Sequence, residues 1–238
     1  WGDAPFPWVE PQVERSGHFI RWNLVADIGG CRVEDGRVIQ DNENSCGIYL
    51  DDYTSNCTIW GNVFLRTGMG VVFHGGKHNV AENNIFVGCR CQLRVSESVS
   101  DRSGHEPMIG WNVGNRFCRN ICTFDDPEAV ISHLSCSRKE KIVHADAFVG
   151  QMDENLYHST SGAYICVIPV TSGETYDEWH KRIPHDEWRQ RGFDWNSVIA
   201  DPLFLDPAND DYRLSADSPA LKLGFVPIEL SHVGIRAG

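Results

Sequence analysis

The chain has 238 residues, and 41% of them are hydrophobic, which is enough to fill a sizeable core in one large domain or two small ones. Lys and Arg number 21 against 33 Asp and Glu, and the net charge of −12 disfavours a nucleic-acid duplex as partner and, to a lesser extent, a polyanionic polysaccharide. No apolar run reaches the roughly 18 residues of a membrane-spanning helix, so we expect no membrane span.

Short strands punctuated by Asn and by turns fill the first half of the chain. The segment RWNLVADIGG around Asn23 is a weak copy of a pattern that is clearer in CTIWGNVFLRTGMGVVFHGG and NVAENNIFVGCRCQLRVSES. Each copy has a short strand, an Asn, two apolar residues, a turn and a second strand. Asn84 follows Asn62 by 22 residues, and a further weak copy, CRNICTFDD, surrounds Asn120. A repeat of this length with short strands and no helix predicts a parallel β-helix rather than a propeller or a leucine-rich repeat.

The Asn residues of the repeat fit the bends of such a coil. Successive turns of a parallel coil lie about 4.8 Å apart. An Asn side chain turned inward at a bend can bond both the local backbone and the Asn of the next turn. We therefore predict an internal ladder formed by Asn23, Asn62, Asn84 and Asn120.

The second strands of the copies also align, as GIYLDD, GVVFHG and QLRVSE. Because side chains alternate along a strand, two columns are predicted to face the core. They are Ile48, Val71 and Leu93, and Leu50, Phe73 and Val95. The intervening residues are predicted to face outward: Tyr49, Val72 and Arg94, with Asp51, His74 and Ser96 beside them. The acid that follows GIYL is therefore predicted to lie on the outer face as well as in a turn.

The repeat fades after about residue 125, and we predict rungs of the coil in residues 1–125 and an irregular segment in residues 126–238. Within the second part, DEWHK and DEWRQRG are each long enough for a turn or two of helix, and a proline-punctuated tail follows. We expect this part to pack on the coil and to cap it. Its Trp179, Trp188 and Trp195 suit either stacking on sugars or burial of the tail against the coil.

Nine cysteines are an odd number, so at least one thiol has no partner within the chain. Cys89 and Cys91 form a C-x-C pair, and Cys118 and Cys122 form a C-x3-C pair, but no second pair follows either at the spacing of a zinc ribbon. We expect small buried residues of a β core, and no metal site.

Several segments together resemble the bacterial right-handed parallel β-helix proteins of the pectate-lyase-like superfamily. They are NLVADIGGC, GIYLDDYTSNCTIWGN, HGGKHNVAENNIFV, NRFCRN and GFDWNSVIADPLFLDPANDDYRLSADSPALKLGFVPI. The chain is most similar to the mostly secreted group beside the β-helical glycoside hydrolases of the xylosidase and fucosidase type. The resemblance implies an all-β fold, a single-stranded right-handed parallel β-helix with a C-terminal segment of loops and short helices. It also implies a secreted or periplasmic protein whose signal peptide is not in this sequence, and a chain that is the later part of a longer β-helix.

The resemblance implies a catalytic Asp at the end of the GIYL strand, which is Asp51 here. The second carboxylate of those hydrolases lies one or two rungs further, where this chain has Val72 and His74, or Ser96 and Glu97. Two rungs separate main chains by about 9.6 Å, close to the roughly 6.5 to 9.5 Å between the carboxyl groups of an inverting glycosidase.

We therefore expect a glycoside hydrolase that acts on an oligo- or polysaccharide and needs no cofactor. The candidate catalytic residues are Asp51, Asp52 and Glu97. The candidate substrate-binding residues are Tyr49, His74, Lys77 and Arg94.

Two other functions fit the same residues. A polysaccharide lyase needs a base and a positive charge beside a uronate carboxylate, which His74, Lys77 and Arg94 could supply, with Ca²⁺ held by Asp51 and Asp52. A β-helix that binds carbohydrate without catalysis is the third class, and the Trp-rich C-terminal segment favours it.

Overall fold

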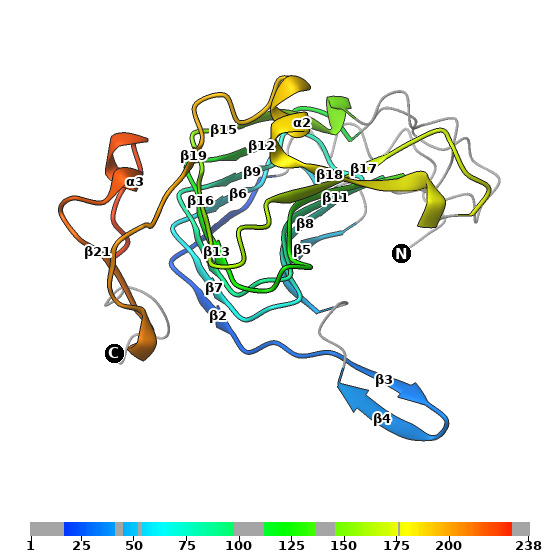
Figure 1. The fold of residues 1–238 in the computed structure, drawn as a ribbon, viewed down its shortest axis with the longest axis horizontal. Helices are drawn as coiled ribbons and strands as arrows, with labels where there is room; N and C mark the ends of the chain where they lie inside the picture. Colours follow the sequence, from blue (N-terminus) through cyan, green and yellow to red (C-terminus); the bar gives the residue numbers. More distant parts are fainter. Residues whose placement is uncertain are drawn as a thin grey trace.

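The computed structural model describes residues 17–40, 45–51, 54–97, 112–136, 146–175 and 177–229. Short strands from successive turns of the chain stack into three sheets that surround a common interior (Figure 1). We call one passage of the chain through the three sheets a rung. The fold is therefore all-β and built mainly of parallel strands, as predicted.

The three sheets are named here in the order in which each rung visits them. The first sheet contains, in spatial order, β1 (Phe19–Arg21), β6 (Thr58–Trp60), β9 (Val80–Glu82), β12 (Asn115–Cys118) and β15 (Val149–Asp153). The second contains β2 (Leu24–Ala26), β7 (Val63–Leu65), β10 (Ile85–Val87), β13 (Ile121–Phe124), β16 (Leu156–Ser159) and β19 (Val198–Ile199). The third contains β5 (Cys46–Leu50), β8 (Met69–His74), β11 (Cys91–Ser96), β14 (Val130–Ser135), β17 (Ile165–Pro169) and β18 (His180–Pro184). All these pairings are parallel except that of β17 with β18.

The predicted Asn ladder is confirmed. The Nδ2 amide of Asn23 donates to Oδ1 of Asn62 at 2.9 Å, and Asn62 donates in the same way to Asn84 at 3.0 Å. Asn84 then donates to Asn120 at 3.0 Å, and Asn120 to Asn155 at 3.3 Å. Asn155 is a fifth member that the sequence analysis missed. The ladder runs along the stacked bends between the first and second sheets, and its hydrogen bonds join each of these rungs to the next.

Replacing Asn62 by Ala is expected to lower the free energy of unfolding by about 1 to 3 kcal/mol, because buried donors and acceptors lose their partners. Asn62 is fully buried, and its Nδ2 also donates to the carbonyl of Ile20 at 2.9 Å. Urea unfolding measures the difference. Asn209→Ala, at the exposed end of a short 3-10 helix in the C-terminal tail, is the control and should stay within about 0.5 kcal/mol of the wild type. An equally small effect at Asn62 would contradict a structural role for the ladder.

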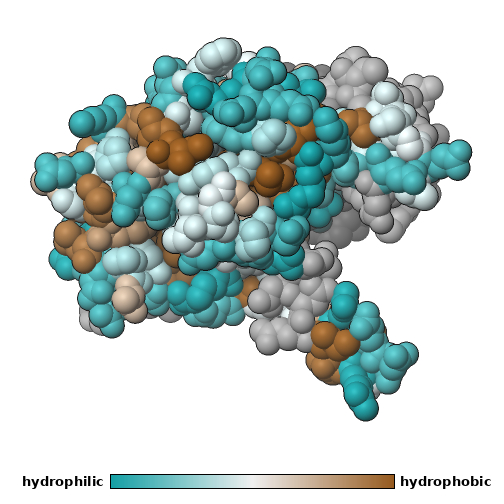
Figure 2. All heavy atoms as spheres, in the orientation of Figure 1, coloured by the Kyte–Doolittle hydropathy of each residue, from teal (hydrophilic) through white to brown (hydrophobic). Residues whose placement is uncertain are grey.

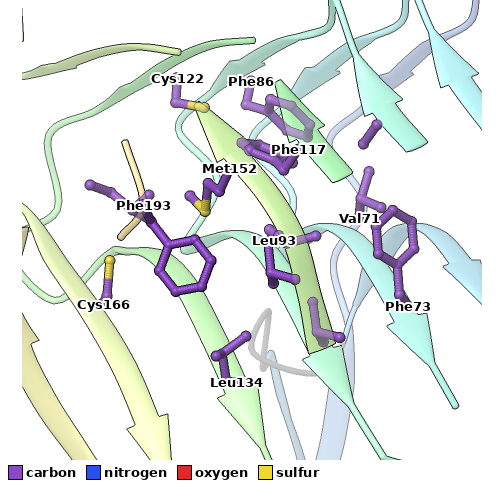
Figure 3. Close-up of a cluster of buried hydrophobic side chains, with 14 of the residues drawn as sticks. Val71, Phe73, Phe86, Leu93, Phe117, Cys122, Leu134, Met152, Cys166 and Phe193 are labelled. Carbon is purple, nitrogen blue, oxygen red and sulfur yellow. The ribbon is translucent and has the colours of Figure 1, made fainter. Parts of the chain in front are cut away.

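The interior is filled by columns of apolar side chains from all three sheets (Figure 3). The register pairs Ile48 with Val71 and Val71 with Leu93, and it pairs Leu50 with Phe73 and Phe73 with Val95, so both predicted columns are confirmed. An aromatic stack continues from the second sheet into the first: Phe64 lies 4.8 Å from Phe86, and Phe86 lies 5.5 Å from Phe117, between ring centroids. Glycine is required opposite this stack. A Cβ added at Gly70 would lie 2.5 Å from the Phe86 ring.

The coil extends past residue 125, where the sequence analysis ended it. Strands β14 to β17 add parallel pairs to all three sheets before the chain leaves the repeat. The predicted boundary is too early because the later rungs are longer. Asn120 follows Asn84 by 36 residues and Asn155 follows Asn120 by 35, so the 22-residue offset is lost while the coil continues.

A buried carboxylate closes the C-terminal end of the ladder. The Asp194 side chain is fully buried and accepts a hydrogen bond from Nδ2 of Asn155 at 3.3 Å, as the next Asn would. It also accepts from Oη of Tyr157 at 3.0 Å, Nε1 of Trp188 at 3.1 Å and Oγ of Ser197 at 2.6 Å. His185 Nε2 lies 3.2 Å from the same carboxylate. Helix α2 (His185–Gln190) supplies Trp188, whose ring stacks on Phe193 with centroids 4.3 Å apart, and both rings close the interior.

The C-terminal tail covers the outer face of the second sheet. It contains β20 (Phe204–Asp206), the 3-10 helix η4 (Pro207–Asn209), β21 (Asp211–Leu214) and α3 (Pro219–Lys222). Its apolar side chains Tyr212, Ala220, Phe225 and Ile228 form a second cluster with Val63 and other outward residues of that sheet. Arg66 joins the two parts through Asp27 on the coil and Asp210 on the tail. Figure 1 shows the tail beside β16 and β13, on the side of the coil away from β5 and β8.

An antiparallel hairpin of β3 (Cys31–Glu34) and β4 (Arg37–Gln40) stands away from the coil between β2 and β5 (Figure 1). Val33 and Val38 are paired across it and are 70% and 73% exposed. Figure 2 shows a hydrophobic spot on this projecting hairpin. The hairpin therefore adds nothing to the core.

Candidate functional site

The outer face of the third sheet brings together most of the predicted site residues. Register places Tyr49 beside Val72 and Val72 beside Arg94, and it places His74 beside Ser96. Asp51 directly follows β5, so it lies at the same end of the sheet as His74. We call the outward side chains Tyr49, Asp51, His74, Arg94 and Ser96 the site face. The C-terminal tail packs on the second sheet rather than on this face.

Tyr49 and His74 form an aromatic pair on neighbouring rungs. Their ring centroids are 5.8 Å apart and their planes differ by 28°, which is a stacked arrangement. Nδ1 of His74 lies 2.7 Å from Oγ of Ser96 on the next rung. Tyr49 is 46% exposed, whereas His74 is half-buried. The pair offers an apolar surface with hydrogen-bonding groups at its edge, which suits the faces and hydroxyl groups of a sugar.

Asp51 is exposed at the end of β5 and also begins a turn, so it lies on the outer face and in a turn, as predicted. Its backbone oxygen accepts bonds from the N–H of Thr54 at 3.1 Å and from Oγ1 of Thr54 at 2.5 Å. A Cβ added at Gly76 would lie 1.8 Å from the oxygen of Thr54. Gly76 therefore allows the turn that follows β8 to pack closely against the turn that carries Asp51. This close stacking positions His74 and Asp51 at adjacent levels.

Arg94 lies over an apolar patch of the site face. Its Nη1 is 3.9 Å from Sδ of Met69, which packs with Val72 and Cys91. Burial raises the pKa of the Cys91 thiol to about 12, and the positive charge of Arg94 opposes that rise. Arg94 as a whole is half-buried, so its charge is less screened than that of a fully exposed arginine.

Two predicted positions, Glu97 and Val72, are more buried than an open groove requires. Glu97 is 5% exposed at the end of β11, where its N–H donates to the carbonyl of Ser135 at 3.2 Å. Val72 points outward but is 1% exposed, because an apolar cluster surrounds it. Lys77 lies in the turn after β8 rather than on the strand, and its N–H donates to Oγ of Ser55 at 3.0 Å. Asp52 lies outside the described residues.

The Trp residues of the C-terminal segment have separate roles. Trp188 is buried and closes the core, so it is not a sugar platform. Trp179 packs half-buried against the core. Trp195 is 61% exposed, with the Arg189 guanidinium 5.8 Å from its ring centroid.

The row of Tyr49 and Arg94 continues onto residues that the sequence analysis missed. His133 pairs with Arg94 in register, and its ring lies 5.3 Å from that of His180 on β18. Burial, together with the charges of Arg94, His180 and Arg182, lowers the pKa of His133 to about 3. The signal was the segment VISHLS, which aligns with CQLRVS when the longer rung is allowed for.

His133 should make the protein less stable as the pH falls. Its pKa is about 3 when folded and about 6.5 when unfolded, so between these values the unfolded chain binds a proton that the folded chain does not. Stability is therefore lost as the pH falls below about 6.5, by up to about 1.4 kcal/mol per pH unit from this residue. Urea unfolding of His133→Gln from pH 7 to pH 4 should show a correspondingly shallower loss. An unchanged slope would contradict a neutral His133 in the folded state.

Neither a metal centre nor a membrane segment is seen in the described part of the chain. Among these residues, no group of three or more His, Cys, Asp or Glu side chains is placed to hold a metal ion. None of the described helices combines the length and apolar character needed to cross a membrane. The proposed Ca²⁺ ligands include Asp52, which is outside the described ranges.

Comparison of the chain with family models, with curated proteins and with solved structures gives no match. The site must therefore be interpreted from its own residues and from the resemblance noted in the sequence.

Proposed function

We propose that the protein is a right-handed parallel β-helix of the pectate-lyase-like kind that acts on carbohydrate along its site face. The motifs quoted above, the Asn ladder and the three parallel sheets support the assignment. Right-handedness is expected because parallel strand connections are right-handed in almost all proteins. The same resemblance supports a secreted or periplasmic location.

One observation carries the proposal. Side chains from three successive rungs lie side by side on a sheet face on which the C-terminal tail does not pack. Tyr49 provides the ring on which a sugar can stack, while His74 and Arg94 provide hydrogen-bond donors for its hydroxyl groups. The spacing between rungs is about 4.8 Å, so a chain of sugars crossing the rungs would meet each of these groups.

We propose glycoside hydrolysis, with Asp51 as the essential carboxylate and Glu97 or Asp52 as its partner. An inverting mechanism needs one carboxylate to activate water and one acid to protonate the leaving oxygen. Asp51 is exposed to the solvent that would supply the water, and Glu97 is shielded from it. Main chains two rungs apart are separated by about 9.6 Å, which suits inversion better than retention.

A uronate lyase is the second candidate, favoured by the cationic groups near the site face. Arg94 is half-buried there and Lys77 follows directly in the turn after β8, so a substrate carboxylate could be neutralised while His74 removes the adjacent proton. The net charge of −12 favours a neutral glycan instead.

Incubation of the protein with a panel of neutral and uronate-containing polysaccharides tests the proposal. New reducing ends without absorbance from unsaturated uronates support hydrolysis, and both signals together support the lyase. Retention of a glycan on an affinity gel without cleavage would indicate that the protein binds carbohydrate without catalysis. A panel that is neither cleaved nor retained would overturn the proposal.

A further inference from the structure

The N-terminal end of the coil is an open end. Strands β1 and β2 are the edge strands of the first and second sheets. Their inward residues Ile20 and Val25 are half-buried, whereas Ile59 and Phe64, which pair with them one rung later, are fully buried. The outward Leu24 is 53% exposed. One layer of core side chains is thus covered on one side only.

The side-chain hydrogen bonds of the Asn ladder all run in the same direction along the coil. Oδ1 of Asn62 accepts from the N–H and Nδ2 of Asn23, at 3.1 and 2.9 Å, and Oδ1 of Asn84 accepts from the same two groups of Asn62, both at 3.0 Å. Within the described part of the chain, no group donates to Oδ1 of Asn23.

The carbonyl bonds of the ladder show the same asymmetry. Nδ2 of Asn62 reaches back to the carbonyl of Ile20 on the preceding rung at 2.9 Å. Nδ2 of Asn23 instead donates to the carbonyl of Arg21 within its own turn, at 3.1 Å. At the opposite end, by contrast, Asp194 supplies the acceptor that closes the ladder. The two ends of the coil therefore differ. Asp194 closes the C-terminal end, whereas at the N-terminal end Asn23 bonds to the following rung in the same way as the interior Asn residues do.

We propose that this open end is a docking surface for one further polypeptide segment of the form strand, Asn, strand, running parallel to β1 and β2. The N–H and side-chain amide of the incoming Asn would donate to Oδ1 of Asn23, as those of Asn23 do to Asn62. Its apolar residues would cover Ile20 and Val25. Recognition of this kind combines main-chain bonding at a sheet edge with side-chain selection.

Two other occupants fit the end less well. Residues 1–16 contain no Asn, and they contain prolines at positions 5, 7 and 11, which have no N–H to donate to a sheet edge. A second copy related by a two-fold axis would bring the two Asn23 acceptors face to face, with no donor between them. Stacking of copies head to tail would need the C-terminal end, which Trp188 and Phe193 close. Residues 1–16 and a second copy are therefore less suitable occupants than a segment of the form strand, Asn, strand.

A peptide copy of an interior rung tests the proposal on the intact chain. The probe is a fluorescent peptide of residues 57–75, which contains β6, Asn62, β7 and β8, and its binding is followed by fluorescence anisotropy. The same peptide with Asn62→Ala should bind about tenfold more weakly or worse, because the donors to Asn23 become fewer and less well placed. Leu24→Lys in the protein should abolish binding by placing a charge on the edge strand.

The control is Ile199→Lys, which places the same charge on β19, the edge strand at the closed end. Ile199 is 52% exposed and Leu24 is 53% exposed, so the two variants are matched. The control should bind the peptide as the wild type does. Absence of binding, equal binding of the two peptides, or a dimer in sedimentation that Leu24→Lys disrupts would each overturn the proposal.

Discussion

Replacing Asp194 by Ala is expected to lower the free energy of unfolding by about 3 to 5 kcal/mol, which is a large part of the stability of a domain of this size. The carboxylate receives hydrogen bonds from Asn155, Tyr157, Trp188 and Ser197, and all of these donors are buried or half-buried. Removal of the acceptor leaves the donors without partners at a site that water does not reach. Burial and the charge of Asp194 also raise the pKa of Tyr157 well above its usual value, which keeps the phenol protonated as a donor.

Urea unfolding of Asp194→Ala and of a matched control measures this effect. Asp217→Ala removes an exposed carboxylate from the same half of the chain and should change the free energy of unfolding by less than about 0.5 kcal/mol. Loss of the near-ultraviolet signal of Trp188 should accompany the loss of stability, because its indole N–H donates to Asp194. An Asp194→Ala protein within about 1 kcal/mol of the wild type would mean that the network does not close the coil.

Asp51→Asn is expected to reduce turnover by roughly 10²- to 10⁴-fold, the range that a positioned acid or base contributes. The substitution keeps the size and shape of the side chain, and the turn bonds to Thr54 come from the backbone of residue 51 rather than from its carboxylate. Circular dichroism and the urea midpoint should therefore be unchanged while hydrolysis is lost.

The exposed Asp217 again provides the control, since Asp217→Asn removes one negative charge away from the site face and should leave turnover unchanged. Retention of activity in Asp51→Asn, together with its loss in His74→Ala or Arg94→Ala and products with unsaturated uronate absorbance, would favour the lyase. Activity in all of these variants would exclude the site face as the catalytic surface.

The sequence predicted those parts of the fold that repeat at short range. The Asn ladder from Asn23 to Asn120 and the two inward columns of the third sheet are visible as a pattern because each rung repeats the same side chains at the same bends. These features depend on local chain geometry, so two aligned copies were enough to find them. Asn155 and the later rungs were missed because their longer loops break the offset.

The closed end could not be predicted in the same way. Asp194 belongs to GFDWNSVIADP, a segment that contributed to the resemblance, but its partners come from positions up to 39 residues away. A buried carboxylate and an exposed one have the same appearance in a sequence. Only the folded arrangement shows that Asp194 is fully buried and that Asp51 is exposed.

The sequence predicted which residues point outward at the candidate site, but not how deeply each of them is buried. The outward positions of Tyr49 and Arg94, and of His74 beside Ser96, follow from alternation along the strand. Alternation does not tell how far an outward residue is covered by its neighbours. Val72 points outward and is nevertheless buried. His133 lies beside Arg94 on the next rung, and it was missed because that rung is longer than the 22-residue repeat.

Binding of a glycan to the site face is the central claim, and calorimetric titration of two matched aromatic variants tests it most directly. The ligand is an oligosaccharide of the glycan that the panel shows to be cleaved or retained. Tyr49→Ala should weaken binding about tenfold or more, because a stacked ring is lost. Trp195→Ala, which removes an exposed ring from the C-terminal segment, should leave binding unchanged. Unchanged affinity in Tyr49→Ala with loss of binding in Trp195→Ala would place the glycan on the C-terminal segment and contradict the claim.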